Sequence, residues 1–473
     1  MRNLLIITLL TIGVCATAQN KRTLSLEECI EIAIDNNLNV QRSELNLQSA
    51  EVNLMQSKAQ RYPTLNASGN YGYTWGRGID PTTNQFIDQR VNFNGVSAQS
   101  NVTLINGLQI TNSIKRDKLS LEASKYDLKR SANDISLAIA QTYLNVIFNR
   151  ELLENAEFQL ESSVQQLEQT KILVESGALP VANQLQLESQ VATNEVSLVN
   201  AQNNLDLALL DLKQSLLLPP GEEIDIVIPE ITVESSDVES QSVSDIYKVA
   251  LENQPEIKSA ELSVESSSVG VDVSKGALYP SLSLSGSIST NYSDADQQRL
   301  NPFQNGFDTL GLFTQTTLDP ILSPNIEGDF TTVPLSDQYD NNLNTRLTLN
   351  LSIPIFNGLS TKAGVERSKI SYQQALISEK EQQNVLYQTI ETSFRNALAA
   401  SKTYESSLRQ VASLEETYRA VENQYNNGAA NFTDYQVAAN NLFQAQSDLS
   451  RAKYDFIFRQ KILDFYLGKP LSF

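Results

Sequence analysis

The chain has 473 residues, no histidine and a formal net charge of −20. The absence of imidazole excludes Ser-His-Asp triads, histidine general bases and histidine metal ligands, and the acidic balance argues against a nucleic-acid partner. The sequence has neither a phosphate-binding glycine loop nor clustered metal ligands, so we expect no enzyme and no cofactor or metal site.

The N-terminal residues have the pattern of an export signal. Arg2 supplies a basic start, residues 4–14 are apolar, and residues 16–18 form a small-residue cleavage site. We therefore expect residues 1–18 to be a signal peptide. Lipidation of Cys15 is an alternative, which is disfavoured because a valine rather than a small residue precedes it. No later stretch reads as an apolar helical span, so membrane embedding would have to use strands.

A helix is predicted over residues 26–60, where the sequence contains neither glycine nor proline. Pro63 ends this run, and strict alternation of apolar and polar residues then predicts strands over about 64–75 and 96–105. Period-two alternation over about ten residues, with aromatic residues near one end, is typical of transmembrane barrel strands. A half-buried hairpin of a soluble sheet would show the same alternation.

Two long helices follow, over about 107–176 and 181–218, with a break at Gly177. Leucine or valine recurs every seven residues in the first, from Leu153 to Val174, which is typical of coiled-coil packing. The other faces are rich in Gln, Asn, Ser and Glu and must be wet. These stripes fit a helical tube with water on both sides, and they equally fit a solid antiparallel coiled coil.

The chain is a duplication. Tyr62-Pro63 recurs 217 residues on, and Asn106-Gly107-Leu108 recurs 251 residues on, with no gap inside either block. We therefore predict a first repeat over 19–218, a linker over 219–242 and a second repeat over 243–473. The second repeat is predicted to contain helices over about 243–277, 358–427 and 431–467 and strands over about 281–292 and 345–354. The longer offset places an acidic loop insertion over 293–345.

Three local signatures fall in the same order as these elements. They are Tyr-Pro-x-Leu before the first strand of each pair (62–65 and 279–282), Pro-Ile-Phe-Asn-Gly at 354–358, and Tyr425-x-x-Gly428 followed by Asn431-x-x-Asp434. With the signal peptide and the duplicated strands and helices, they make the chain resemble the TolC-like outer membrane efflux proteins. The resemblance implies a mainly α fold with a β-barrel part and four transmembrane strands per chain. It also implies a homotrimer with a 12-stranded barrel and a 12-helix periplasmic tunnel, in which 219–242 is an equatorial linker.

The same resemblance implies a function. The chain would be a passive exit duct of a tripartite efflux or type I secretion system, in the bacterial outer membrane with a periplasmic extension. Its partners would be outer-membrane lipid, a periplasmic adaptor protein and an inner-membrane transporter. The alternatives are a periplasmic adaptor, which would carry one hairpin rather than two, and a structural coiled-coil surface protein.

Two groups of site residues follow from the resemblance. The helical turns would form the periplasmic end and dock the adaptor through small apolar residues: Gly177, Ala178, Leu179, Gly428, Ala429 and Ala430. The channel entrance would be narrowed by a ring of Asp434 carboxylates. The family's charged closure contacts are absent here, which would leave at most a neutral hydrogen bond from Tyr425 to Asn183.

Overall fold

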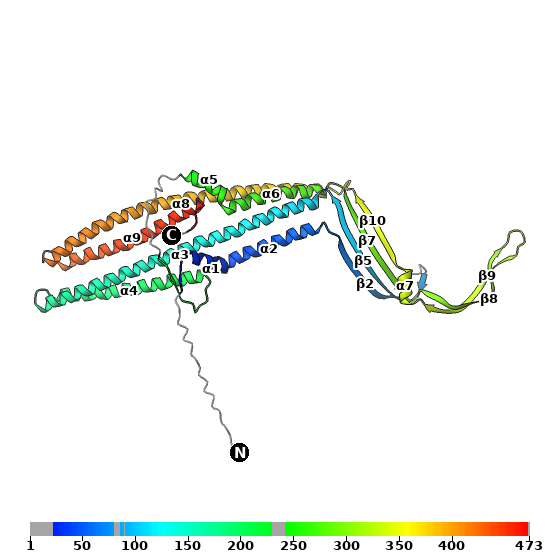
Figure 1. Cartoon of the computed structure of the whole chain (residues 1–473), viewed down its shortest axis with the longest axis horizontal. Coiled ribbons are helices and arrows are strands. Elements are labelled where there is room, and N and C mark those ends of the chain that lie inside the picture. Colours follow the sequence, from blue (N-terminus) through cyan, green and yellow to red (C-terminus); the bar gives the residue numbers. More distant parts are fainter. Residues whose placement is uncertain (1–21, 80–85, 89, 229–241, 472–473) are drawn as a thin grey trace, which may run out of the picture. The chain divides into compact units, whose positions relative to one another are not determined.

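The computed structural model describes residues 22–79, 86–88, 90–228 and 242–471. The expected signal peptide, Cys15 and part of the expected linker lie outside these residues. The described residues form two compact units (Figure 1): a helical unit drawn from the ranges 1–51, 119–265 and 373–473, and a strand unit drawn from the ranges 52–118 and 266–372. Each unit takes segments from both predicted repeats, so the boundaries of the repeats stay a prediction.

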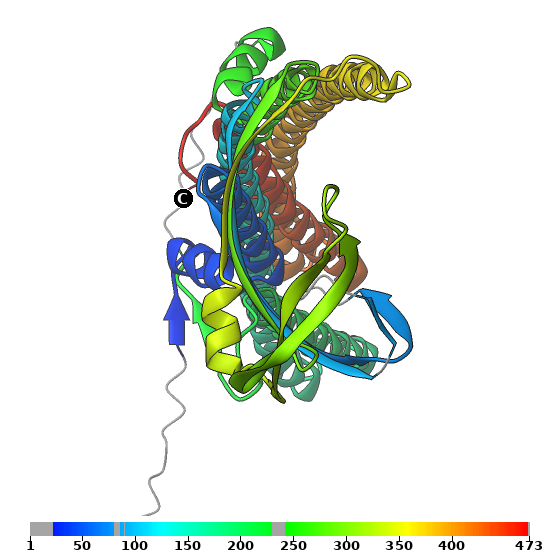
Figure 2. The same cartoon turned by 90° about the vertical axis from the view of Figure 1, so that its right-hand side faces the viewer.

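The strand unit is built on one antiparallel sheet of four strands in the order β10-β7-β5-β2. Its strands are β2 (Thr64–Thr74), β5 (Val91–Asn106), β7 (Ser281–Ser293) and β10 (Asn344–Ser352). All four lie where the alternation predicted strands. The sheet is curved rather than flat (Figure 2).

The register of the sheet aligns the alternating patterns of all four strands. Ala67 pairs with Ala98, which pairs with Ile288, and Gly286 between Ser100 and Leu347 continues the same face. This face carries most of the large apolar residues of the sheet: Leu65, Tyr71, Tyr73, Val96, Val102, Leu282, Leu284, Ile288, Leu347, Leu349 and Leu351. The opposite face is almost entirely Ser, Thr, Asn and Gln, and Ser68 and Ser97 share a 2.8 Å hydrogen bond on it. The sheet is therefore apolar on one side and polar but nearly uncharged on the other.

The segment 293–345, expected as a loop, is instead structured. It forms a hairpin of β8 (Gln297–Phe313) and β9 (Pro320–Thr332), followed by the short helix α7 (Leu335–Asn341). The irregular register of β8 and the prolines hid the alternation from the sequence pattern. A second small hairpin joins β3 (Arg77–Ile79) to β4 (Phe86–Asp88).

Eight longer helices make up most of the described part of the chain. They are α1 (Leu26–Asn36), α2 (Leu38–Ala59), α3 (Gln109–Glu175), α4 (Val181–Ser215), α5 (Val243–Asn253), α6 (Pro255–Gly276), α8 (Ser360–Asn426) and α9 (Phe432–Tyr466). The single helices predicted over 26–60 and 243–277 are each broken in two. Asn37 and Gln254 adopt extended backbone, and Pro255 after Gln254 disfavours helix at that residue.

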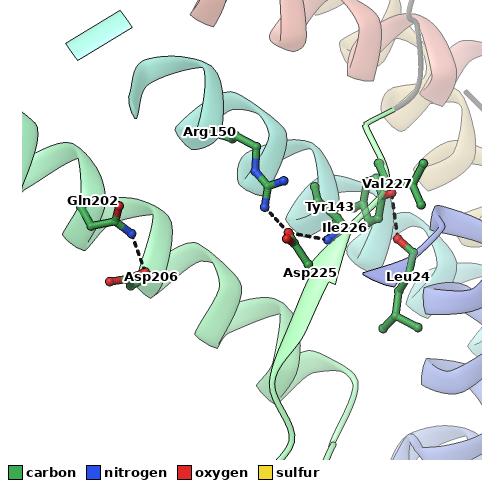
Figure 3. A network of polar contacts seen from close by, with 8 residues as sticks. All are labelled: Leu24, Tyr143, Arg150, Gln202, Asp206, Asp225, Ile226 and Val227. Carbon is green, nitrogen blue, oxygen red and sulfur yellow. Dashed lines mark hydrogen bonds and ion pairs between the residues drawn. The ribbon is translucent and has the colours of Figure 1, made fainter. Parts of the chain in front are cut away.

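The described residues of the helical unit pack around three hydrophobic clusters. The largest contains buried residues of α1, α3, α4 and α9, and it includes the short parallel pair β1 (Arg22–Leu24) and β6 (Ile224–Ile226). Tyr143 of α3 is 1% exposed, and its hydroxyl bonds to the carbonyl oxygens of Leu24 and Val227 (Figure 3). Arg150 forms an ion pair with Asp225 beside it. These contacts fix β1 and β6 against α3.

Candidate functional site

The two long helix pairs of the helical unit end in matching turns. Gly177 between α3 and α4 has φ +76°, and Gly428 between α8 and α9 has φ +73°. In each turn, the backbone N–H of the glycine and the N–H of the following alanine donate to carbonyl oxygens in the last turn of the preceding helix. The two distances are 2.9 and 2.8 Å for Gly177 and Ala178, and 2.9 and 2.7 Å for Gly428 and Ala429. Glycine suits both positions because other residues are strained at positive φ. The turns are therefore two copies of one capping structure.

The predicted docking residues lie on the surface of these turns. Gly177, Ala178, Gly428 and Ala429 are exposed, and Leu179 and Ala430 are half-buried. No atom lies within 4 Å of the place where a side chain would begin at either glycine. A partner can therefore approach both turns without meeting a bulky side chain at their tips.

The surface around the Gly177 turn is more apolar than Gly177, Ala178 and Leu179 alone suggest. Ile172, Leu173, Val181 and Leu185 flank it and are all exposed, the first at 66%. On α9 the comparable exposed residue is Val437. Sequence reasoning missed this flank because it considered only the turn residues, and exposure depends on how α3 and α4 pack together.

Asp434, the predicted entrance acid, is exposed in the first turn of α9. Asn431 caps this helix, because its side-chain oxygen accepts a 2.9 Å hydrogen bond from the Asp434 backbone N–H. Among the described residues the Asp434 carboxylate has no ion-pair partner. The local structure therefore holds a free negative charge beside the turn, at the positive end of the helix.

Tyr425 belongs to a packed cluster that joins both helix pairs near their turns. The buried residues of the cluster are Leu167 of α3, Leu187 of α4, and Phe432 and Tyr435 of α9. The Tyr425 ring stacks on Tyr435 with a centroid distance of 5.1 Å. We call the four aromatic residues of this cluster the aromatic clasp: Tyr418, Tyr425, Phe432 and Tyr435.

The Tyr425 hydroxyl does not bond to Asn183 in this chain. The hydroxyl is buried and has no hydrogen-bond partner among the described residues. The Asn183 backbone N–H donates to the carbonyl oxygen of Pro180 at 3.0 Å. Tyr425 is therefore a packing residue of the clasp, and it lies seven residues after Tyr418, another residue of the clasp.

The other hydroxyls of the clasp are bonded and protonated. Tyr418 donates to the carboxylate of Glu422 at 3.0 Å and lies 3.1 Å from the Tyr435 hydroxyl. Burial is the main reason that the pKa of Tyr418 and the pKa of Tyr435 are raised. Both side chains therefore stay neutral at physiological pH.

A cavity of about 140 Å³ lies next to the clasp, between α3, α4, α8 and α9. Amide side chains line much of it, including Gln159, Gln190 and Asn194. Asn194 is 3% exposed, yet it accepts a 2.8 Å hydrogen bond from the Gln190 side chain and donates to the Gln159 carbonyl. The buried amide of Asn194 therefore has hydrogen-bond partners.

No helix within the described part of the chain is long and apolar enough to cross a membrane. The same residues contain no group of three or more Cys, Asp or Glu side chains that could hold a metal ion.

Comparison with known proteins identifies the family. The model of the outer membrane efflux protein family matches residues 29–216 and 246–469. The outer membrane protein TolC of Escherichia coli K12 is 22% identical over 426 residues, which cover 87% of this chain and 76% of TolC. The cation efflux system protein CusC of the same strain is 22% identical over 441 residues, covering 90% of this chain and 82% of CusC.

The fold agrees with that of a solved member. The crystal structure of VceC from Vibrio cholerae matches with a TM-score of 0.72 at 16% identity, covering 94% of this chain and 97% of VceC. The predicted fold class is confirmed, and the family match covers both predicted repeats, which favours the efflux protein over an adaptor or a surface rod. The chain therefore belongs to the outer membrane efflux protein family, and it is a non-enzymatic efflux channel of the bacterial outer membrane with a periplasmic extension.

Proposed function

We propose that three copies of this chain close one barrel and form the exit duct of a tripartite system. The observation that carries this proposal is the four-stranded sheet, which has one apolar face and two outer strands, β2 and β10, without a further partner in the described chain. Each unpaired backbone group costs several kcal/mol in hydrocarbon, so both edges must be paired by other strands. Four strands are too few for a barrel, whereas three chains supply twelve.

The polar face of the sheet then lines the barrel. Its described residues are mostly neutral, and Arg346 of β10 is the charged residue on this face in the aligned register. A neutral, hydrated lining lets cargo pass without tight binding and provides no source of energy. The duct is therefore passive, and an inner-membrane transporter supplies the driving force.

The proposed channel has a direct test in planar bilayers. Purified protein should give stable conductance steps. In the outer-membrane fraction of cells, the protein should migrate differently on gels with and without heating. Protein that inserts but never conducts would contradict the channel, and migration unchanged by heating would contradict the closed barrel.

The periplasmic adaptor docks at the turns around Gly177 and Gly428. The support is the exposure of both turns and the apolar flank of Ile172 and Val181 beside the first, which an adaptor hairpin can cover. Ala429→Glu places a charge in this surface and should abolish efflux at unchanged trimer and membrane levels. The matched control is Ala399→Glu, at an exposed position within α8. Unchanged efflux in Ala429→Glu would remove this turn from the docking surface.

Asp434 forms an acidic ring at the entrance. Threefold symmetry would set three exposed carboxylates around one axis, and a ring of like charges attracts cations. Asp434→Asn should reduce block of single-channel current by multivalent cations. Asp35→Asn, at an exposed acid of α1, is the control and should leave the block unchanged. Equal block in Asp434→Asn and parent would show that Asp434 does not face the pore.

The β8–β9 hairpin lies outside the cell. The hairpin follows β7 and precedes α7 and β10 in the chain, whereas α6 and α8 adjoin the other ends of these two strands. The hairpin and the helices therefore lie at opposite ends of β7 and β10. A tag inserted at Asn325 should be labelled on intact cells. Labelling only after lysis would reverse this topology.

A further inference from the structure

The β8–β9 hairpin has two different faces. Residues paired directly across an antiparallel hairpin lie on the same side, and β9 alternates without interruption from Pro320 to Thr332 while the irregularities fall in β8. One side, the apolar face, contains these large side chains: Phe307, Phe313, Leu322, Ile326 and Phe330. The other side, the acidic face, contains Asp308, Glu327 and Asp329, together with Leu300, Phe303 and Ile321.

The acidic residues lie on one face only among the residues paired in the hairpin. All three acids of the paired residues lie on one side, and two are bonded there to neighbouring amides, Asp308 to Asn325 and Glu327 to Asn305. The apolar face carries a single charged residue, Arg299, which lies over the Phe330 ring at 5.1 Å. In the single chain the apolar face is uncovered, with Phe307, Phe313 and Phe330 each 61% exposed.

An uncovered face of this kind requires a partner. A lone two-stranded hairpin is marginally stable in water, and contiguous exposed apolar patches of this kind mark interaction sites. Anionic lipid headgroups would be met by Lys and Arg, but Arg299 is the only basic residue in the whole segment 294–345. The face therefore fits another apolar protein surface better than a lipid surface.

The base of the hairpin is held firmly to the sheet. Gln338 of α7 is fully buried, and its side chain accepts from the Ser293 N–H and donates to the carbonyl oxygens of Ser293 and Val333, all at 2.9 Å. Tyr339 donates to Asn94 of β5 at 2.6 Å, and Asn342 donates to the Asn291 carbonyl of β7 at 2.8 Å. Figure 2 shows α7 beside the start of the hairpin. Each copy of the chain thus presents its hairpin at a fixed place on the barrel rim.

Symmetry then brings the same surface together three times. A barrel of twelve strands spaced about 4.8 Å apart and tilted roughly 40° has a radius of roughly 12 Å. A strand of 17 residues such as β8 can reach roughly 55 Å. Three hairpins on one rim are therefore within reach of one another at high effective concentration.

We propose that the apolar faces of the three hairpins pack against one another and form a crown over the outer mouth of the channel. The occupant of each apolar face is the hairpin of another copy of this chain, and the acidic faces point to solvent. This proposal rests on the trimer and the topology proposed above.

Cysteine pairs on adjacent positions test the crown, because Cys29 is buried and is the only cysteine in the described chain. Leu322→Cys lies on the apolar face, and Ser323→Cys, one residue on, lies on the acidic face. Oxidation of intact cells should link Leu322→Cys chains into dimers within each trimer and protect this thiol from a membrane-impermeant maleimide. Ser323→Cys should be labelled and should not cross-link.

A second pair guards against misfolding. Thr309→Cys sits opposite Leu322 and Asp308→Cys sits opposite Ser323, so neither removes a large apolar side chain, and they should repeat the two results. If apolar-face thiols are labelled as readily as acidic-face thiols in an intact trimer, the crown is wrong and the trimer stands. Protection without cross-linking, or a disulfide to a different protein, would show another occupant and would also overturn the crown. Loss of the trimer in the parent protein would instead refute the proposed assembly.

Discussion

Substitutions in the aromatic clasp can decide whether a hydrogen bond or side-chain packing holds the two helix pairs together. The resemblance to the family implies a bond from the Tyr425 hydroxyl, which would be worth about 1 kcal/mol, or roughly fivefold in an equilibrium. In the structure this hydroxyl is buried without a partner, while the ring stacks on Tyr435 at 5.1 Å and lies 6.0 Å from Phe432. The two substitutions Tyr425→Phe and Tyr425→Ala separate these contributions.

Tyr425→Phe keeps the ring and removes an unbonded buried hydroxyl. The clasp should therefore be unchanged or slightly more stable. Tyr425→Ala removes the ring, with a loss of roughly 2 kcal/mol from half-buried area and aromatic contacts. Because the clasp joins α8 and α9 to Leu167 and Leu187, this loss should shift the balance toward separated helix pairs by about thirtyfold.

Single-channel recording in planar bilayers measures that balance. Tyr425→Phe should have the open probability and conductance of the parent, and Tyr425→Ala should show more frequent or larger openings. If Tyr425→Phe opens the channel as much as Tyr425→Ala does, the hydroxyl carries the interaction and the packing account fails. In that case the hydroxyl must bond to another copy of the chain.

Three further predictions concern folding. Tyr143→Phe leaves the Val227 carbonyl without its side-chain donor and should lower the free energy of unfolding by about 1–2 kcal/mol by denaturant titration, whereas Tyr126→Phe on the same helix should change it little. Burial raises the pKa of the Cys29 thiol from 9.0 to about 12. The contribution of Cys29 to the free energy of unfolding is therefore fully present below pH 9 and falls as the pH rises toward 12. Because the thiol is buried and protonated, its labelling by maleimide should require unfolding. Gly428→Ala should destabilise the protein by about 1–2 kcal/mol because φ is +73° at this residue. Gly364→Ala, inside α8 with open space around it, should stabilise the protein by about 0.5–1 kcal/mol. Equal shifts in melting temperature for the two variants would refute the strain argument.

Much of the fold could be predicted because period and length are local properties of the sequence. The alternation from Thr64 to Thr74 predicted β2, and the absence of breakers predicted the long helices α3 and α8. The breaks at Asn37 and Gln254 were missed, although Pro255 offered a signal for the second. Asn37 carries no such signal, since it ends α1 within a run that has neither glycine nor proline.

The β8–β9 hairpin was missed for a different physical reason. Its pairing slips at three places in β8, and the first two slips shift the alternation between faces, so a fixed period of two does not appear. The partner strand β9 alternates regularly, but Pro320 and Pro324 made it read as a loop. Only the paired register reveals which residues share a face.

Some features of the candidate site could also be predicted from the sequence, and others could not. The helical turns at Gly177 and Gly428 were visible because a positive φ selects glycine after a long helix. The packing of Tyr425 against Phe432 and Tyr435 is seen only in the structure, whereas its bond to Asn183 was implied by the family resemblance, and the Tyr425 hydroxyl has no partner among the described residues. The apolar flank at Ile172 and Val181 depends on the tertiary packing of α3 and α4, which no single-helix pattern determines.

In the proposed assembly, this chain supplies four of the strands of a barrel shared by three copies. Native mass spectrometry of detergent-extracted protein measures the number of copies directly. We expect one dominant species with three times the mass of the processed chain, and conductance that disappears when this species is dissociated. A folded species of one chain that inserts into a bilayer and conducts ions would contradict it, because four strands would then have closed a pore alone.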